Sequence, residues 1–308
     1  MDVNPANVAE RFRTEVRSDI SAIYDASGLK LKLVGLLAGD DPASRVYSDY
    51  TRVGCEDVGV IYEAREVSRT DLERTIRELN ADNNVTGIIV YYPVFGGARD
   101  AHLRSVLSPL KDIEGLHPFW LERLYSNKRI LDGITSQKIK ALLPCTPLAI
   151  LKLLEAAGEM TNTDSLPFSG KKVSIFNRSE VVGRPLAHML SNDGAEVFSF
   201  DIDGLVLFSP GGKEEESKMT RAEALRQSDI VITGVPSNDF DVIRSEELGK
   251  ESCCLNFSSF RNFSEDVPSS VKTFIPRVGP VTVAMCLRNL LRVYKQFSGC
   301  SQVDFPFS

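Results

Sequence analysis

The chain has few of the residues from which metal sites and covalent cross-links are built. Its 308 residues include 3 histidines and 6 cysteines, and no two cysteines stand in a C-x-x-C spacing. We therefore expect no metal site, and we interpret the cysteines as reduced and mostly packed in the interior. A chain of this length can bury a sizeable core without such cross-links.

Long apolar runs and an excess of positive charge are also missing. No run reaches the length that a membrane-spanning helix requires. The formal net charge is −6, which argues against broad attraction to nucleic acid or to an anionic membrane. Asp2, Glu10 and Glu15 interrupt the basic N-terminal stretch, contrary to the pattern of a transit peptide. We expect a cytoplasmic protein with neither a nucleic-acid nor a membrane partner.

What the first half of the chain does contain is an alternation of helical and strand-like segments. Apolar spacing or apolar runs predict helices over 8–20, 44–58 and from a capping box at 70–73, and strands over 31–37, 60–67 and 85–90. Residues 91–145 are less regular, and their segments 91–93 and 111–115 are interpreted as loops beyond strand ends. The alternation predicts an α/β fold with a largely parallel sheet.

A second α/β unit begins near residue 172. A helix with Thr146 as its N-cap and Pro147 at its first position leads into it. Strands are then expected at 173–176, 196–200, 229–235 and 253–257, and helices at 183–192 and 281–297. Residues 204–218 are interpreted as a solvated loop. We predict two domains, residues 1–145 plus 286–308 and residues 146–285, with the last helix returning to the first domain.

The segment from Lys172 to Asp201 has the length of one mononucleotide-binding unit. Its glycine signature is weak, because Asn177 stands where the first glycine is expected and Gly183 opens the helix. Asparagine tolerates a positive φ, and a glycine at a helix start lets backbone amides approach a pyrophosphate. The motif alone leaves two interpretations open: a Rossmann-type dinucleotide site and an ordinary βαβ unit.

Asp201 favours the dinucleotide interpretation. It directly follows the second strand, where an acid about 20 residues after the glycine turn is expected. A carboxylate there accepts hydrogen bonds from ribose hydroxyls and repels a 2′-phosphate, which favours NAD over NADP. A solvated aspartate at a strand end is the alternative, and Asp203 is a weaker candidate for the same role. Arg178 points the other way, because a guanidinium can hold a 2′-phosphate.

Several motifs occur in the order and at the spacing of one known family. They are Lys111-Asp112-Ile113-Glu114-Gly115, Pro144-Cys145-Thr146-Pro147, Asn177-Arg178-Ser179-Glu180-Val181-Val182-Gly183-Arg184-Pro185 and Val278-Gly279-Pro280-Val281-Thr282-Val283-Ala284-Met285. With a tyrosine-containing stretch at 41–51 they cover nearly the whole chain. The sequence therefore resembles the methylenetetrahydrofolate dehydrogenase/cyclohydrolase family.

The resemblance implies roles for individual residues. Catalytic and folate-binding positions are Tyr47, Thr51 (where the family has a lysine), Tyr91, Glu114 and, for binding alone, Pro280. Cofactor-binding positions are Asn177, Arg178, Ser179, Val182, Gly183 and Asp201. The resemblance also implies a homodimer built through the second domain, and 5,10-methylenetetrahydrofolate as the substrate, with or without a polyglutamate tail.

The departures from the family pattern fall mainly in the substrate site. Thr51 replaces the lysine, Tyr91 replaces a glutamine and Glu114 replaces an aspartate. This combination resembles the monofunctional, NAD-dependent branch of the family known from fungi. Oxidation of the substrate by hydride transfer needs no general base, whereas hydrolysis of the methenyl product needs proton transfers that a lysine assists. We expect a dehydrogenase without significant cyclohydrolase activity.

Three other functions stay open at this point. A bifunctional, NADP-dependent enzyme is disfavoured by Thr51 and Asp201. A catalytically inactive folate- or nucleotide-binding protein would explain the loss of the lysine and the glutamine together. An unrelated two-domain dehydrogenase would leave the motifs of the first half unexplained.

Overall fold

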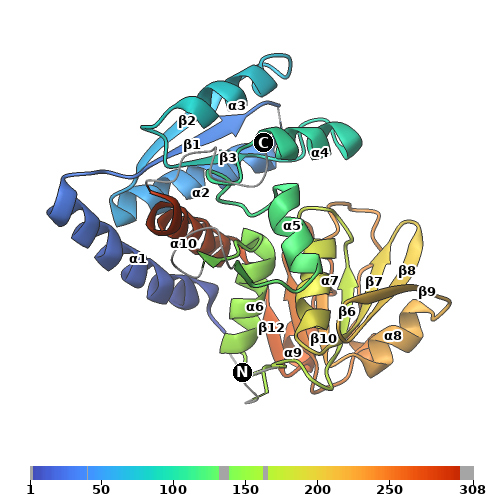
Figure 1. The fold of residues 1–308 in the computed structure, drawn as a ribbon. Coiled ribbons are helices and arrows are strands. Elements are labelled where there is room, and N and C mark those ends of the chain that lie inside the picture. Colours follow the sequence, from blue (N-terminus) through green and yellow to red (C-terminus); the bar gives the residue numbers. More distant parts are fainter. Residues whose placement is uncertain (1–2, 40, 132–138, 162–165, 299–308) are drawn as a thin grey trace. The chain divides into compact units, whose positions relative to one another are not determined.

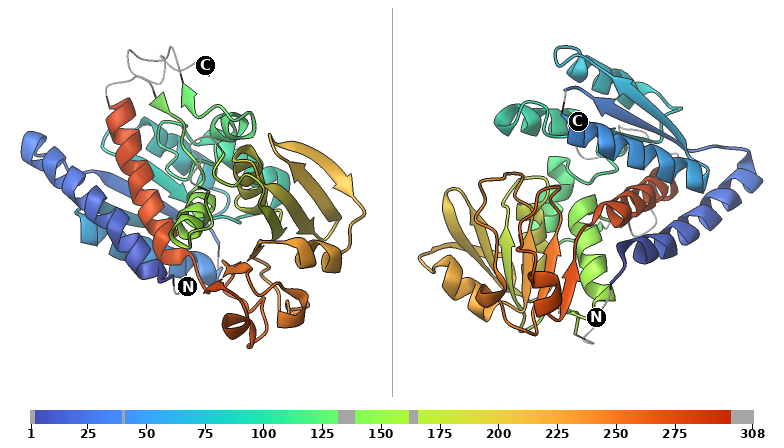
Figure 2. Two further views of the ribbon diagram at one scale, coloured as in Figure 1. Left: turned by 90° about the horizontal axis from the view of Figure 1, so that it is seen from below. Right: turned by 180° about the vertical axis from the view of Figure 1, so that it is seen from behind.

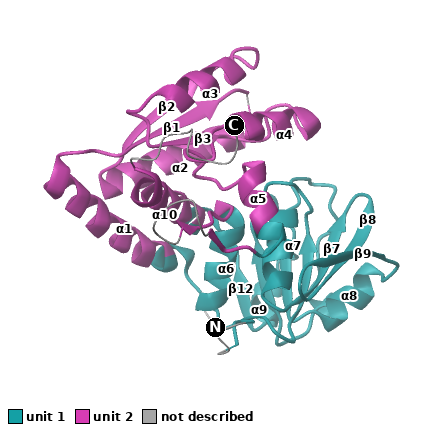
Figure 3. Ribbon diagram, viewed as in Figure 1, with its two compact units in different colours: residues 1–8, 124–127, 146–281 teal, residues 9–123, 128–145, 282–308 magenta. Residues whose placement is uncertain are grey.

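The structure is a computed structural model that describes residues 3–39, 41–131, 139–161 and 166–298 (Figure 1). The chain forms two compact units, which Figure 3 shows in different colours. Unit 1 comprises residues 1–8, 124–127 and 146–281, and unit 2 comprises residues 9–123, 128–145 and 282–308, in each case as far as they are described. No helix within the described ranges is long and apolar enough to cross a membrane.

Unit 2 is built around a three-stranded parallel sheet with the order β2-β1-β3. The strands are β1 (Lys32–Leu37), β2 (Ile61–Glu66) and β3 (Gly87–Val90). Side chains on successive residues of a strand point to opposite faces. Val34 and Leu36 of β1 are buried in a core shared with Ile76 and Leu103, whereas Gly35 faces the rings of Tyr62 and Tyr91 on the other side.

Helices account for most of the rest of unit 2. They are α2 (Pro42–Val58), α3 (Leu72–Ala81), α4 (Gly97–Val106) and most of α1 (Pro5–Ser27), α5 (Pro118–Tyr125) and α10 (Gly279–Phe297). Asp41 caps α2 by accepting from the backbone N–H groups of Ala43 and Ser44, and Gly59 ends that helix at a φ of 82°. The predicted helices and strands before residue 91 are all present.

Residues 91–145, which the sequence indicated to be less regular, contain the helices α4 and α5 and an antiparallel pair of short strands, β4 (Ile130–Leu131) and β5 (Ile139–Lys140). The segments 91–93 and 111–115 lie outside the helices and named strands, as predicted. One detail of the prediction was wrong. The predicted capping box at Thr70 does not form, because α3 begins at Leu72 with Asp71 at its N-cap. The Asp71 carboxylate accepts from Ser68 and Arg74 instead of from the helix backbone.

Unit 1 contains a seven-stranded sheet with the order β12-β11-β10-β6-β7-β8-β9. The parallel strands are β6 (Lys172–Phe176), β7 (Glu196–Asp201), β10 (Ile230–Thr233), β11 (Cys253–Asn256) and β12 (Thr273–Ile275). The helices are α6 (Cys145–Ala156), α7 (Gly183–Asn192), α8 (Arg221–Gln227) and α9 (Val267–Ser270), with a 3₁₀ turn at Ser245–Glu247. Figure 2 shows α6 and α8 on opposite sides of this sheet. Because α6 begins at Cys145, Thr146 is a helical residue and not the N-cap that was predicted.

The prediction of a solvated loop at 204–218 was wrong. This segment forms a β-hairpin of β8 (Gly204–Ser209) and β9 (Lys213–Ser217), antiparallel to β7. Leu205 and Phe208 are buried, so the apolar run 205–208 pairs along β7 and packs into the core. The charged run that follows forms the edge strand, where charged side chains disfavour further pairing with another chain.

The cysteines of the described chain are free and buried, as expected: Cys55, Cys145, Cys253, Cys254 and Cys286. Cys300 lies outside the described residues.

Candidate functional site

Hydroxyl groups from three elements of unit 2 form a connected chain. The Ser48 hydroxyl on α2 lies 2.7 Å from the Tyr62 phenol oxygen on β2, which in turn lies 2.7 Å from the phenol oxygen of Tyr91 beyond β3. Gly35 makes room for them, since a Cβ there would lie 2.2 Å from the Tyr62 oxygen and 3.0 Å from the Tyr91 ring. An apolar run with one glycine thus creates space for two phenols.

Thr51 completes this chain from inside α2. Its side chain has 0% exposure, and its hydroxyl donates to the carbonyl of Tyr47 one helical turn earlier at 2.9 Å. Burial raises the pKa of the Tyr91 phenol far above its usual range, Tyr62 adds to this rise, and a hydrogen bond with Thr51 opposes it. The positions where the family carries a lysine and a glutamine therefore hold two neighbouring hydroxyls that stay neutral near pH 7.

Tyr47 provides a half-buried aromatic wall beside this chain. Its ring meets the Tyr91 ring edge to face, with centroids 5.4 Å apart and planes at 84°, which is a favourable aromatic geometry. Its phenol oxygen lies 3.1 Å from the Cys286 sulfur. Burial raises the pKa of the Tyr47 phenol, and the nearby Cys286 and Glu114 raise it further. The structure thus brings Tyr47, Thr51 and Tyr91 together.

Glu114 lies in a loop whose shape Asp112 fixes. The Asp112 carboxylate accepts from the backbone N–H groups of Glu114 at 3.0 Å, Gly115 at 3.1 Å and His117 at 2.7 Å. Burial raises the pKa of Glu114 well above its ordinary value, and Cys286 and Asp112 raise it further. In this environment the ionised form of a carboxyl group is strongly stabilised by any hydrogen-bond donor or cation that approaches it.

Sequence reasoning missed Arg104, a buried arginine whose positive charge acts on Glu114. Arg104 lies on α4 with 8% exposure, and its guanidinium carbon lies 5.7 Å from the centre of the Tyr92 ring. Its charge lowers the pKa of Glu114 and opposes the effect of burial. Within the described ranges no hydrogen bond or ion pair holds this guanidinium. A single arginine in a short helix carries no signal by which the sequence could have revealed its burial.

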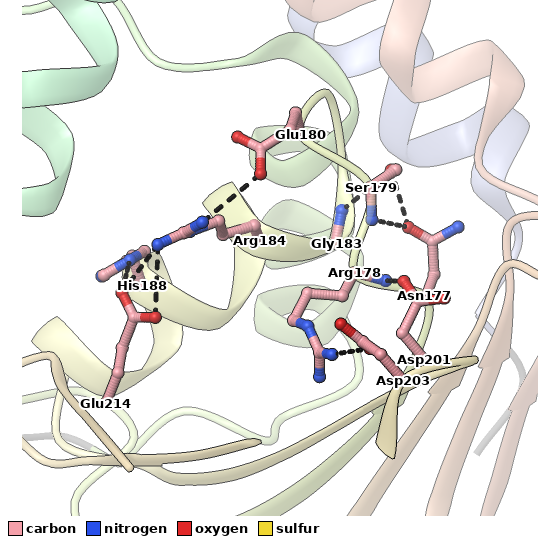
Figure 4. A network of polar contacts seen from close by, with 10 residues as sticks. All are labelled: Asn177, Arg178, Ser179, Glu180, Gly183, Arg184, His188, Asp201, Asp203 and Glu214. Carbon is pink, nitrogen blue, oxygen red and sulfur yellow. Dashed lines mark hydrogen bonds and ion pairs between the residues drawn. The ribbon is translucent and has the colours of Figure 1, made fainter. Parts of the chain in front are cut away.

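The loop between β6 and α7 in unit 1 is closed by side-chain hydrogen bonds (Figure 4). Asn177 accepts from the backbone N–H of Ser179 at 3.0 Å and from its hydroxyl at 2.7 Å, and donates to the carbonyl of Gly234 at 2.9 Å. Asn177 does not adopt the positive φ that the sequence suggested, because its side chain closes the turn instead. Val182 is the N-cap residue of α7, and its backbone N–H donates to the Ser179 hydroxyl at 3.3 Å.

Gly183 is required where this loop enters α7. A Cβ at Gly183 would lie 1.9 Å from the carbonyl oxygen of Asn177, far inside contact distance, so any side chain would force the loop away from the helix. The first-turn N–H groups of a helix and its dipole form a ready site for an anion such as a pyrophosphate. The loop therefore fits a dinucleotide cofactor.

Asp201 lies at the end of β7, beside this loop. Its two carboxylate oxygens accept from the backbone N–H of Arg178 at 2.9 Å and of Ile202 at 2.7 Å. Each oxygen keeps a lone pair for a further donor such as a ribose hydroxyl. Pro280, the remaining residue with an implied role, is the second residue of α10 and is half-buried.

Comparison with known proteins identifies the family of this chain. Residues 3–114 match the model of the tetrahydrofolate dehydrogenase/cyclohydrolase catalytic domain, and residues 144–298 match its NAD(P)-binding domain. The methylenetetrahydrofolate dehydrogenase [NAD(+)] of Dictyostelium discoideum is 42% identical over 301 residues, covering 96% of this chain and 93% of that protein. The bifunctional protein FolD of Maridesulfovibrio salexigens is 29% identical over 315 residues, covering 96% and 99%.

A solved structure agrees with these matches. The NAD-dependent 5,10-methylenetetrahydrofolate dehydrogenase of Saccharomyces cerevisiae superimposes with a TM-score of 0.90 at 36% identity, covering 97% of this chain and 98% of that one. The two family models together span most of the sequence. The chain belongs to the tetrahydrofolate dehydrogenase/cyclohydrolase family.

Proposed function

We propose that this protein is an NAD-dependent methylenetetrahydrofolate dehydrogenase that oxidises 5,10-methylenetetrahydrofolate to 5,10-methenyltetrahydrofolate without significant cyclohydrolase activity. The observation that carries the proposal is the buried Thr51–Tyr91 pair, which puts neutral hydroxyls where the family has a lysine and a glutamine. The higher identity to the relative named for NAD than to the bifunctional one supports it.

The proposed roles of the folate-site residues follow from their contacts. Tyr47 and Tyr91 offer aromatic surface to the folate rings, with their geometry held by the hydroxyl chain. Glu114 accepts hydrogen bonds from pterin N–H groups, and Pro280 contacts the folate. We assign folate binding to residues 1–145 plus 286–308 and cofactor binding to residues 146–285.

On the cofactor side, the loop residues Asn177, Arg178, Ser179, Val182 and Gly183 form the cofactor-binding loop, in which Gly183 lets the pyrophosphate approach the helix start, and Asp201 accepts from the ribose. When bound, NAD supplies the hydride acceptor. The carbon that loses hydride lies between two folate nitrogens, whose lone pairs stabilise the resulting cation. The protein therefore needs no general base for this step, and its contribution is to hold the reacting atoms close together in the correct orientation.

Hydrolysis of the methenyl product makes a different demand. Water must attack the cation, and protons must move between nitrogen and oxygen atoms, which a positioned acid or base accelerates. Neither Thr51 nor Tyr91 ionises near pH 7, because a threonine hydroxyl does not titrate in this range and burial raises the pKa of Tyr91 further. The site therefore supports oxidation and not hydrolysis.

Two further parts of the proposal rest on the family resemblance: the protein acts as a homodimer, and it accepts its folate with or without a polyglutamate tail. A location in the cytoplasm is proposed from the sequence expectation alone.

A test of the proposal uses the purified full-length protein. Incubation with methylenetetrahydrofolate and NAD should produce NADH, incubation with NADP should be much slower, and added methenyltetrahydrofolate should decay only at its uncatalysed rate. No reduction of either cofactor would show a binding protein instead, and rapid decay of the methenyl compound would show a bifunctional enzyme. Asp201→Ser should raise the relative use of NADP, and an unchanged ratio would refute the ribose role.

A further inference from the structure

The turn between β7 and β8 carries a second acid close to Asp201. The antiparallel register pairs Asp201 with Gly204, so Ile202 and Asp203 are the two residues of a tight hairpin turn. Gly204 adopts a φ of 112°, which strongly favours glycine. The hairpin that the sequence did not predict thus places a second carboxylate at the edge of the cofactor loop.

Both terminal nitrogens of the Arg178 guanidinium are held by this turn and by the strand before it, and Figure 4 shows the contact with Asp203. One terminal nitrogen donates to the carbonyl oxygens of Ser199 at 2.9 Å and Gly204 at 3.2 Å. The other terminal nitrogen donates to the Asp203 carboxylate in a short ion pair. The Arg178 side chain is 13% exposed and that of Asp203 is 73% exposed, so the acid covers the arginine from the solvent side.

This arrangement changes what Arg178 offers to a cofactor. A guanidinium is the side chain best suited to a phosphate, because its planar fork forms two parallel hydrogen bonds with two oxygens. Here the fork is already used by two carbonyls and a carboxylate. A phosphate on the 2′-hydroxyl of the adenosine ribose would have to displace Asp203 and remain beside its negative charge.

We propose that Asp203 is a second determinant of cofactor choice, which acts by occupying Arg178. The inference rests on the proposed NAD-dependent function and adds to the role of Asp201. Asp201 accepts hydrogen bonds from the ribose hydroxyls and repels a phosphate directly. Asp203 instead pairs with Arg178, the cation of the β6–α7 loop that would otherwise be able to bind the phosphate. NADP therefore meets two carboxylates and an arginine that is already paired.

The test measures dissociation constants of NAD and NADP on the full-length protein by calorimetry at low ionic strength. Asp203→Asn removes the charge with little change of shape at an exposed position. The ratio of the two constants should move toward NADP by about fivefold to tenfold, as expected for one charge near a phosphate in a partly solvated site. In an Arg178→Gln background the same change should shift the ratio clearly less, because only the direct repulsion between Asp203 and the phosphate is removed and there is no cation to release.

A matched control is Glu251→Gln, which changes the net charge by the same amount as Asp203→Asn. Glu251 is exposed and precedes β11 at the amino end of the strand, whereas the cofactor loop follows the carboxyl end of β6. This variant should keep the wild-type ratio, so that a shift with Asp203→Asn reports the local contact and not the overall charge.

Three results would overturn the inference. One is an unchanged ratio in Asp203→Asn, and another is a shift of the same size in the Arg178→Gln background, which would mean that Asp203 acts without Arg178. A third is a loss of NAD affinity with unchanged NADP affinity, which would make Asp203 a ribose ligand. If the wild-type protein bound neither nucleotide, the proposed function itself would fail, and this outcome is distinct from the other three.

Discussion

The phenol oxygens of Tyr62 and Tyr91 lie 2.7 Å apart, and this contact explains how two departures from the family pattern fit together. Tyr91 stands where the family has a glutamine, and Thr51 stands where it has a lysine. Both belong to one buried chain of hydroxyls that Ser48 and Tyr62 complete. The site has therefore been rebuilt around neutral donors and acceptors and has not merely lost a catalytic group.

Because the site has been rebuilt, Thr51→Lys alone should not create cyclohydrolase activity. A lysine at a position with 0% exposure would lie next to the phenols of Tyr62 and Tyr91, which are neutral and do not compensate its charge. Burying an unpaired ammonium costs several kcal/mol unless it is neutralised, so we expect a loss of about 2–4 kcal/mol in unfolding free energy. Denaturant unfolding and a methenyl hydrolysis assay measure the two effects.

The control for this variant is Thr51→Ser, which keeps the hydroxyl and should keep stability within about 1–1.5 kcal/mol. Rapid hydrolysis by Thr51→Lys with Tyr91 still in place would contradict the view that both positions must change together. The double variant Thr51→Lys/Tyr91→Gln tests that view directly, since it restores both residues of the family pattern.

Gly183→Ala should weaken cofactor binding. The new Cβ would lie 1.9 Å from the Asn177 carbonyl oxygen, and the loop must move to relieve the clash. Overpacking of this kind costs about 1–3 kcal/mol, which corresponds to NAD binding about tenfold to hundredfold weaker. Gly249→Ala is the matched control, because its Cβ would meet only the Ser252 hydroxyl, at 3.2 Å. Equal NAD affinity in both variants would refute the role of Gly183.

The pH dependence of folate use should report on Glu114. Burial raises the pKa of this carboxyl, and only its ionised form accepts hydrogen bonds with both oxygens. The value of kcat/KM should therefore be full above the raised pKa and fall as the pH drops through it. Arg104 lowers the pKa of Glu114, so Arg104→Gln should move the acid limb of the profile to higher pH.

Arg99→Gln serves as the control for Arg104, because Arg99 is an exposed residue of the same helix and the change in charge is identical. Its profile should match the wild type. Superimposable profiles for the two variants would show that Arg104 does not act on Glu114.

Glu159 should contribute to the stability of unit 1 in a pH-dependent way. Its side chain is 2% exposed and pairs with Lys171 and Lys272, each at 2.8 Å. Burial raises the pKa of Glu159, but hydrogen bonds from the two lysines outweigh it, and the net pKa is lowered. A lowered folded-state pKa means that the stabilisation is present above the unfolded-state pKa and is lost as the pH falls through the folded-state value.

Glu159→Gln should therefore lower the unfolding free energy at pH 7 by about 1–3 kcal/mol. In this variant the unfolding free energy should also fall less steeply as the pH drops into the acidic range. Glu155→Gln is the comparison, since Glu155 forms an exposed pair with Lys152 that is worth about 0–1 kcal/mol. Chemical denaturation across acidic and neutral pH measures both. Equal losses in the two variants would mean that burial of Glu159 adds nothing.

The sequence by itself determined the features that depend on neighbouring residues along the chain. Apolar runs and helical spacing located β1, β3 and α7, since their periodicity is a local property. The ordered motifs indicated the family, and the position of Asp201 after its strand indicated the cofactor site. The capping box at Thr70 failed because α3 begins after Asp71, and the Asp71 carboxylate pairs with Ser68 and Arg74, which a pattern of residue types does not reveal.

Only the tertiary structure decided which distant residues share one environment. The hairpin at 204–217 forms because β8 finds a partner in β7, and its turn brings Asp203 to Arg178, whose own interactions the sequence left open. Packing of α2 against the sheet brings Thr51 and Tyr91 together. Arg104 is buried because other parts of the folded chain cover it, and not because of the sequence of its own helix. Strand pairing, burial and charge neutralisation are long-range effects, so they were decided when the chain folded and not by any single segment.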